Sequence, residues 1–190
     1  MNINILFPVA ILNYQINNEL ADIVEKKFLE KLDQIPKLDG HYGDFFLSNR
    51  IFDLENDVPE LYSEILKCRS EYYNITGLDS TNGLVEFWTQ DYREIGQRHD
   101  RHEHGIHGIS GVYWIRANEN ASKLTFYNPN KINSYASYST DTSFSWQQFS
   151  YKAEKGSILL FPSYLEHEVK PICDNTIRST IAFNFPLKLG

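Results

Sequence analysis

The chain has 190 residues, of which 42% are hydrophobic and 23% are charged, a balance that excludes a disordered or fibrous protein and predicts one globular domain over residues 1–190. Its 18 basic and 25 acidic residues give a formal net charge of −7, and with no basic run this argues against a nucleic-acid partner. The longest apolar run, residues 5–12, is too short to cross a membrane, and two cysteines do not make a disulfide framework. The N-terminus lacks the basic segment of a secretory signal, so we expect a cytoplasmic protein.

The first predicted elements are an edge strand and a helix. Residues 4–12 are apolar, and Pro8 within them favours an edge position because proline cannot donate to a β-ladder. Residues 17–32 carry apolar side chains at helical spacing, and Asn17 or Asn18 supplies a helix cap.

A break and a second helix follow. Residues 35–44 are rich in Pro and Gly and predict an irregular connection. A new helical pattern starts near Pro59, a residue suited to a first helical turn, and ends at a turn cluster over residues 74–83.

From residue 84 onward the pattern is of short strands, which the aromatic content of 14% also favours. The predicted strands cover residues 84–88, 109–116, 123–127, 157–161, 168–172 and 178–185. Helices followed by antiparallel strands indicate a mainly β (α+β) fold, for which a jelly roll is a usual closure. The polar segment 128–148 is long for a connection, so we interpret it as a mobile loop or as a substrate lid that contains Tyr135 and Tyr138.

A histidine cluster is the most informative local feature. Four of the six histidines fall within residues 99–107. In an extended backbone His102 and His104 point to one side, so both rings can reach one metal ion, whereas Glu103 points away. His99 lies three residues before His102, a helical spacing that an adjoining strand does not support. A solvated histidine-rich loop is the alternative interpretation.

Two further positions fit a metal site with an anion beside it. His167 follows an apolar strand and a proline turn, and Arg178 is a lone cation within an apolar strand. A guanidinium can bind both oxygens of a carboxylate, and Thr180 lies on the same side of the strand with a hydroxyl to donate. The alternatives are a structural histidine, and an edge charge or buried ion pair for Arg178.

The motifs occur in an order and spacing that resemble a known family. They are His102-Glu103-His104, Ser110-Gly111-Val112-Tyr113, Leu124-Thr125-Phe126 with Pro129, Gly156 with Phe161-Pro162-Ser163, His167-Glu168-Val169-Lys170-Pro171, Arg178-Ser179-Thr180 and Ala182-Phe183-Asn184. Together they resemble the 2-oxoglutarate/Fe(II)-dependent oxygenases related to prolyl hydroxylases, particularly a subgroup common in phages and marine bacteria.

This resemblance implies a fold and a set of site residues. The fold is a double-stranded β-helix (a cupin-like jelly roll) over residues 84–186, with residues 1–83 as supporting strand and helices. The metal ligands are His102, His104 and His167. Arg178 and Thr180 match the pair that holds the far carboxylate of 2-oxoglutarate, and Trp114 falls where relatives often place a tyrosine that touches the same carboxylate. Phe126, Phe161, Val112 and Trp114 are candidate wall residues of the site, with a purely structural place in the jelly-roll core as the alternative for each.

The implied activity is that of a dioxygenase, an oxidoreductase that uses Fe(II), O₂ and 2-oxoglutarate to hydroxylate a substrate and releases succinate and CO₂. His104 departs from the family, because many relatives carry Asp there, and three histidines also suit zinc. Asp100 is the nearest carboxylate that could replace one histidine. A phage origin would place the protein in an infected host cell.

Two other classes of protein remain open at this point. One is a different metal-cupin enzyme, although the Glu expected after the second histidine of such a motif is replaced by Gly108 and Ile109. The other is a non-catalytic jelly-roll binding or virion-associated module with a structural metal site, in which Arg178 and Thr180 would have no carboxylate to bind. The sequence predicts neither the primary substrate, a protein or a small molecule, nor the oligomeric state.

Overall fold

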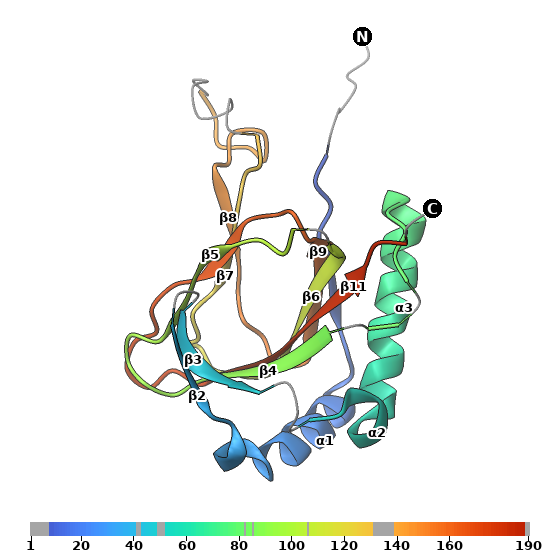
Figure 1. Ribbon diagram of the computed structural model, residues 1–190. Coiled ribbons are helices and arrows are strands. Elements are labelled where there is room, and N and C mark those ends of the chain that lie inside the picture. The colour runs from blue at the N-terminus through green and yellow to red at the C-terminus, as the bar shows by residue number, and fades with distance from the viewer. Residues whose placement is uncertain are drawn as a thin grey trace.

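The computed structural model describes residues 8–40, 43–48, 52–81, 83–84, 86–105, 107–130 and 139–188. Strands contribute more of these residues than helices do, and the helices gather on one side (Figure 1). The elements in chain order are β1 (Leu12–Gln15), α1 (Asn18–Leu29), the 3-10 turn η1 (Leu32–Gln34), β2 (Lys37–Gly40), β3 (Gly43–Ser48), α2 (Leu54–Asp57), α3 (Pro59–Thr76), β4 (Glu86–Tyr92), β5 (Arg98–His102), β6 (His107–Ala117), β7 (Leu124–Tyr127), β8 (Gln148–Tyr151), β9 (Ser157–Pro162), β10 (His167–Val169) and β11 (Arg178–Pro186).

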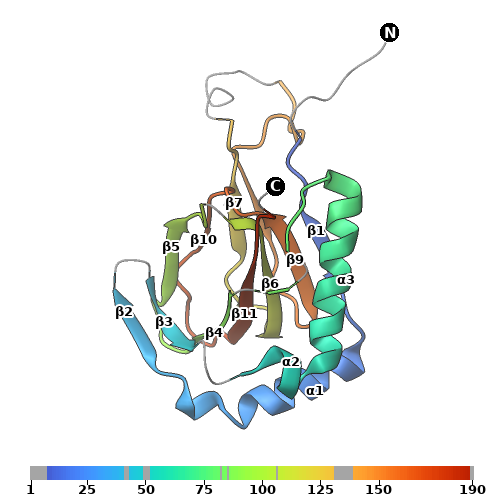
Figure 2. The same cartoon turned by 45° about the vertical axis from the view of Figure 1, so that its right-hand side comes forward.

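All the strand pairs are antiparallel and run in the order β1-β9-β6-β11-β4-β3-β5-β10-β7-β8, with β2 added beside β3. The sheet curls, so that β5, β10 and β7 come to lie opposite β6, β9 and β11 (Figures 1 and 2). Two walls of strands therefore enclose an interior between them.

Side chains alternate along the central strands and build two separate cores, because neighbours in a strand face opposite sides. One set packs between the helices and the wall formed by β6, β9 and β11, which is the larger of the two walls. This set includes Tyr113, Ile158, Leu160, Ile181 and Phe183. The other set faces the interior of the curled sheet, and includes Tyr92, Val112, Trp114, Leu159 and Phe161. The central strands read as continuous apolar runs because both of their faces are covered.

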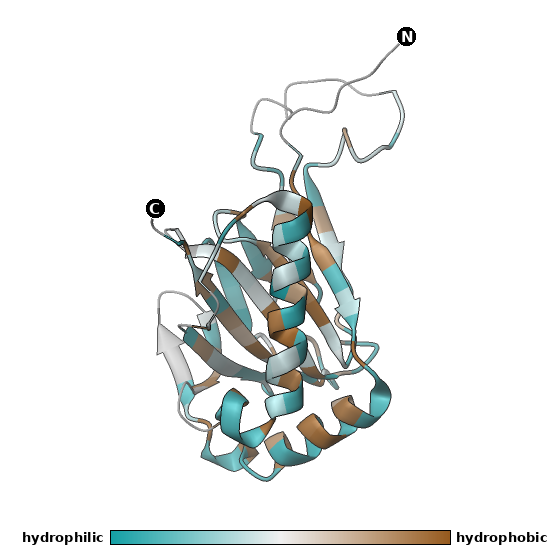
Figure 3. Cartoon of the chain, turned by 90° about the vertical axis from the view of Figure 1, so that its right-hand side faces the viewer, coloured by the Kyte–Doolittle hydropathy of each residue, from teal (hydrophilic) through white to brown (hydrophobic). Residues whose placement is uncertain are grey.

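The helices close the outer side of the larger wall. Helix α3 lies along the strands (Figure 3), and its side chains Leu61, Ile65, Cys68 and Tyr72 are buried. The Asn17 side chain accepts from the amide of Leu20 at 2.8 Å and caps α1.

The predicted helices are thus confirmed, and α3 starts at Pro59 as expected. Residues 35–44, expected to be irregular, instead contribute to the β2–β3 hairpin, because β3 finds partners in β4 and β5. The strand expected over residues 4–12 is displaced: residues 8–11 form no strand, and the edge strand β1 begins only at Leu12. Residues 1–7 lie outside the described part, as do Tyr135 and Tyr138. Within the described residues, no helix is long and apolar enough to span a membrane.

Candidate metal centre and adjoining pocket

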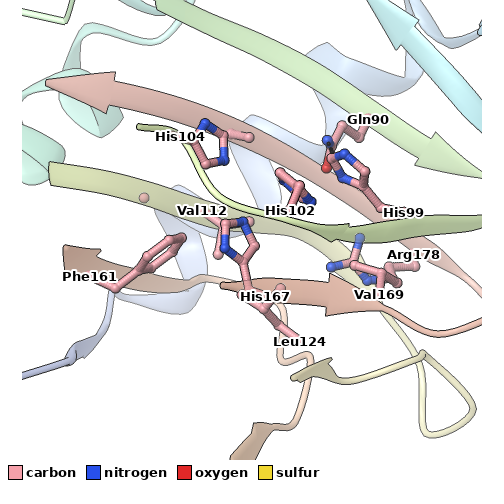
Figure 4. A pocket seen from close by; sticks show the side chains of 12 residues that line it. Gln90, His99, His102, His104, Val112, Leu124, Phe161, His167, Val169 and Arg178 are labelled. Atoms are coloured by element: carbon pink, nitrogen blue, oxygen red, sulfur yellow. Dashed lines mark hydrogen bonds between the residues drawn. The ribbon is translucent and has the colours of Figure 1, made fainter. Parts of the chain in front are cut away.

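Three histidines converge inside the curled sheet. His102 ends β5 and is paired directly with His167, the first residue of β10, while His104 follows β5 without belonging to it. One ring nitrogen from each lies within 4.8 Å of the others, and Figure 4 shows the three rings around one space. The sequence prediction that these residues share a site agrees with this arrangement.

Hydrogen bonds to the backbone orient two of the rings. His102 Nδ1 lies 2.7 Å from the carbonyl oxygen of Asp100, and His167 Nδ1 lies 2.8 Å from that of Leu165. A carbonyl only accepts, so Nδ1 carries the proton in both rings and Nε2 keeps its lone pair. This is the usual way in which a protein fixes a metal-binding histidine.

His104 is held in a different way. Its backbone N–H donates to the carbonyl of Ser163 at 2.8 Å, which ties the segment after β5 to the end of β9. Its ring stacks on Trp88 at 5.9 Å, and its Nδ1 lies 3.4 Å from the side-chain nitrogen of Asn184.

Burial keeps two of these rings neutral. Burial and the nearby His102 hold the pKa of His167 well below its usual 6.5, and burial also lowers the pKa of His102. Metal binding requires a deprotonated imidazole nitrogen. These two rings are therefore ready for a cation at neutral pH without first releasing protons.

Arg178, the first residue of β11, points into the same interior. It is 1% exposed, and within the described residues no carboxylate pairs with it. Its Nε donates to the carbonyl of Ser122 at 3.2 Å, and its guanidinium lies 4.7 Å from the ring centre of Tyr92. Its Nη1 is buried without a hydrogen-bond partner. An unpaired buried cation is costly, so this position calls for an anionic ligand.

Two neighbouring donors are also buried without partners. They are the Tyr92 hydroxyl, on the residue paired directly with Arg178, and Nε1 of Trp114. Burial raises the pKa of Tyr92 to about 12, against the opposing effect of Arg178, so the phenol keeps its proton. Buried polar groups without partners usually mark an absent ligand or water. Thr180 differs, because its hydroxyl donates to Oε1 of Gln90 at 3.1 Å.

A single cavity connects the triad to Arg178. It is lined by Gln90, His99, His102, His104, Gly111, Val112, Leu124, Phe161, His167, Val169, Arg178 and Ala182. In Figure 4, Arg178 lies at the end of the cavity away from His104. Of the predicted wall residues, Val112 and Phe161 line it, whereas Phe126 and Trp114 belong to the surrounding apolar cluster. The cavity therefore has three convergent imidazoles at one end and a buried guanidinium at the other.

Two cavity residues were not predicted as site residues. The spacing of His99 to His102 was judged one that a strand does not support, but the two rings stack with centres 3.9 Å apart. The reason is a β-bulge between two residue pairs, His167 with His102 and Val169 with His99. From one pair to the next, β10 advances by two residues and β5 by three, and the extra residue in β5 turns His99 inward. Gln90 was missed because an isolated glutamine carries no motif.

The nearby carboxylates stay outside this cluster. Glu103 is exposed, as its place in the strand pattern predicted, and accepts from the amide of Gly105. The Asp100 side chain pairs with Arg98 at 2.8 Å, so it does not replace a histidine in this arrangement.

Comparison with known proteins agrees with this picture. Residues 86–184, about half of the chain, match the model of the family described as "Putative 2OG-Fe(II) oxygenase". No curated protein sequence matches the chain.

Solved structures with the same fold cover nearly all of the chain. A prolyl-4-hydroxylase from Pseudomonas putida has a TM-score of 0.68 at 13% identity, and the match covers 95% of this chain and 94% of that one. A prolyl hydroxylase from Trichoplax adhaerens, in complex with a hypoxia inducible factor peptide fragment, has a TM-score of 0.65 at 14% identity, covering 94% and 83%. The epimerase SnoN from nogalamycin biosynthesis, non-heme and α-ketoglutarate-dependent, has a TM-score of 0.67 at 9% identity, covering 93% and 78%.

These matches confirm the double-stranded β-helix expected from the sequence. The family match extends over all three histidines and Arg178. The chain is therefore a member of the 2OG-Fe(II) oxygenase family of enzymes.

Proposed function

We propose that the chain is an Fe(II)- and 2-oxoglutarate-dependent dioxygenase that hydroxylates a C–H bond of its substrate. In this reaction one atom of O₂ enters the product alcohol and the other enters succinate, formed as 2-oxoglutarate loses CO₂. The observation that carries the proposal is the shared cavity: three convergent histidines and a buried arginine without an anionic partner face the same space.

Each residue has a distinct role in this proposal. His102, His104 and His167 would hold Fe(II), and Arg178 would bind the far carboxylate of 2-oxoglutarate through its unpaired Nη1. Trp114 Nε1 and the Tyr92 hydroxyl are further donors of the right kind. When bound, the metal and 2-oxoglutarate together supply the activation of O₂, which no side chain here can provide.

Charge balance supports this ligand set. Three neutral histidines leave a metal dication with its full charge, and Arg178 adds one more positive charge in the same cavity. 2-Oxoglutarate brings two negative charges. A histidine at 104 in place of a carboxylate makes the site one unit more positive, which favours an anionic cosubstrate.

We propose a protein segment, not a small molecule, as the primary substrate of this chain. The support is that the structure of the similar prolyl hydroxylase from Trichoplax adhaerens contains a peptide fragment. A zinc site is the competing proposal, because three histidines with an open position suit Zn²⁺ as well. The buried Arg178 has no role in that alternative.

Anaerobic titration separates these proposals. Metal-free protein receives Fe(II) and then 2-oxoglutarate, and the weak visible charge-transfer band of the chelate is followed. We expect a band in the wild type, a weaker one in Arg178→Ala, and none in His167→Ala. Succinate release under O₂, measured with candidate peptides, then tests turnover. Tight zinc retention with no band would refute the oxygenase proposal.

A further inference from the structure

The cavity contains a chain of three polar side chains beside the triad: Thr180, Gln90 and His99. Thr180 on β11 and Gln90 on β4 are direct partners in the ladder, and both are buried. The Thr180 hydroxyl donates to Oε1 of Gln90 at 3.1 Å. The oxygen of the amide is therefore turned toward Thr180, and its nitrogen is turned to the other side.

That nitrogen faces His99. Gln90 Nε2 lies 3.4 Å from His99 Nδ1, and the two side chains lie next to each other in Figure 4. An amide nitrogen is only a donor, so Nδ1 of His99 must accept and the ring proton sits on Nε2. This is the opposite tautomer to that of His102 and His167, whose Nδ1 protons go to backbone carbonyls.

The ring has little freedom to move. It stacks on His102 with centres 3.9 Å apart and 22° between the planes, and it leans on Phe45 at 4.8 Å. It lines the cavity together with the triad and Arg178. His99 thus offers a donor in the space where His102 and His167 offer lone pairs.

We propose that His99 binds the cosubstrate by donating its Nε2 proton to a cosubstrate oxygen, and that Gln90 and Thr180 are positioning residues that hold His99 in this tautomer. This inference rests on the proposed function. It also changes the expected part of Thr180, which acts through Gln90 instead of donating to the far carboxylate itself.

The tautomer can be measured without any cosubstrate. In zinc-loaded protein labelled with ¹⁵N, ring spectra distinguish protonated from unprotonated Nδ1 in each histidine. We expect His99 as the Nε2–H form, with His102 and His167 as Nδ1–H references. Gln90→Glu replaces the donor with an acceptor, so His99 should change to Nδ1–H. A merely structural Gln90 would not cause this change, and a wild-type His99 already in the Nδ1–H form would overturn the inference.

Affinity for 2-oxoglutarate is then measured by calorimetry on zinc-loaded protein. His99→Phe keeps the stacking and removes the donor, and Gln90→Met removes the orienting amide without adding charge. Both should weaken binding roughly tenfold to 100-fold, the usual effect of losing a hydrogen bond to a charged group. The control Gln148→Met, at an exposed position on β8, should bind like the wild type.

Zinc content and melting temperature confirm that each variant is folded. If the wild type binds 2-oxoglutarate and His99→Phe binds it equally well, the role of His99 is refuted and the proposed function stands. If the wild type binds zinc but no 2-oxoglutarate, the proposed function itself fails, and the cosubstrate role of His99 fails with it.

Discussion

Replacing Arg178 with methionine should make the metal-free protein more stable and at the same time weaken the affinity of the zinc-loaded protein for 2-oxoglutarate. Methionine has a similar length and no charge. Arg178 is 1% exposed and lacks an anionic partner among the described residues, so in the free protein it is a cost to folding that only a bound anion would offset.

The size of the effect follows from the contacts. Removing the charge eliminates a desolvation penalty of several kcal/mol. Against this, the Ser122 carbonyl loses its 3.2 Å hydrogen bond, which costs about 1–3 kcal/mol. The contact with Tyr92, at 4.7 Å, contributes up to about 2 kcal/mol. We expect a net gain of about 1–2 kcal/mol, or roughly 2–8 °C in melting temperature for a chain of this size.

The assay combines thermal unfolding of metal-free protein with calorimetric titration of 2-oxoglutarate into zinc-loaded protein. Loss of a buried charged partner costs about 2–5 kcal/mol, so affinity should fall roughly 30-fold to several thousand-fold. Arg116→Met is the matched control. Arg116 pairs with the buried Asp91 at 3.1 Å, so its removal should destabilise the protein. A lower melting temperature for Arg178→Met would refute the view that this charge is unpaired.

Three further predictions concern other parts of the chain. His167→Ala should weaken metal binding at least about 100-fold, measured by competition with a chelator, because even losing a residue that only orients a ligand costs about 10–100-fold. At pH 8 a maleimide should label Cys173 and not Cys68, as measured by mass spectrometry. Burial raises the pKa of Cys68 to about 12, so its thiol stays protonated, and labelling of both cysteines would contradict this. Gly111→Ala should destabilise the fold by about 1–3 kcal/mol in urea titrations, because the new Cβ would lie 2.2 Å from the Phe183 ring. An unchanged midpoint would show that the strands that carry these two residues, β6 and β11, can separate.

Much of the fold could be predicted because its signals are local. Asn17 and Pro59 mark helix starts through the chemistry of single residues. The hairpin over residues 37–48 could not be predicted, because its strands depend on partners far along the chain.

The residues of the site, too, could be predicted from the sequence only in part. The i, i+2 spacing predicted that His102 and His104 would act together, and the structure brings them together with His167. The contact between His99 and His102 was not predicted, because a bulge is a property of two paired strands and one strand's sequence does not reveal it. That Arg178 is buried without an anionic partner likewise becomes visible only when the residues around it are known.

The three predicted ligands are not equally constrained by the backbone. His102 and His167 face each other in the ladder, so neither can move without shifting the register of β5 against β10. His104 sits beyond the strand, and what anchors its segment is a backbone hydrogen bond to Ser163 that any residue except proline could make. The residue at position 104 can therefore change during evolution without any change in the surrounding backbone. In the proposed metal site, the fold would thus separate a fixed pair, His102 and His167, which would locate the ion, from position 104, whose side chain would set the charge of the ligand set.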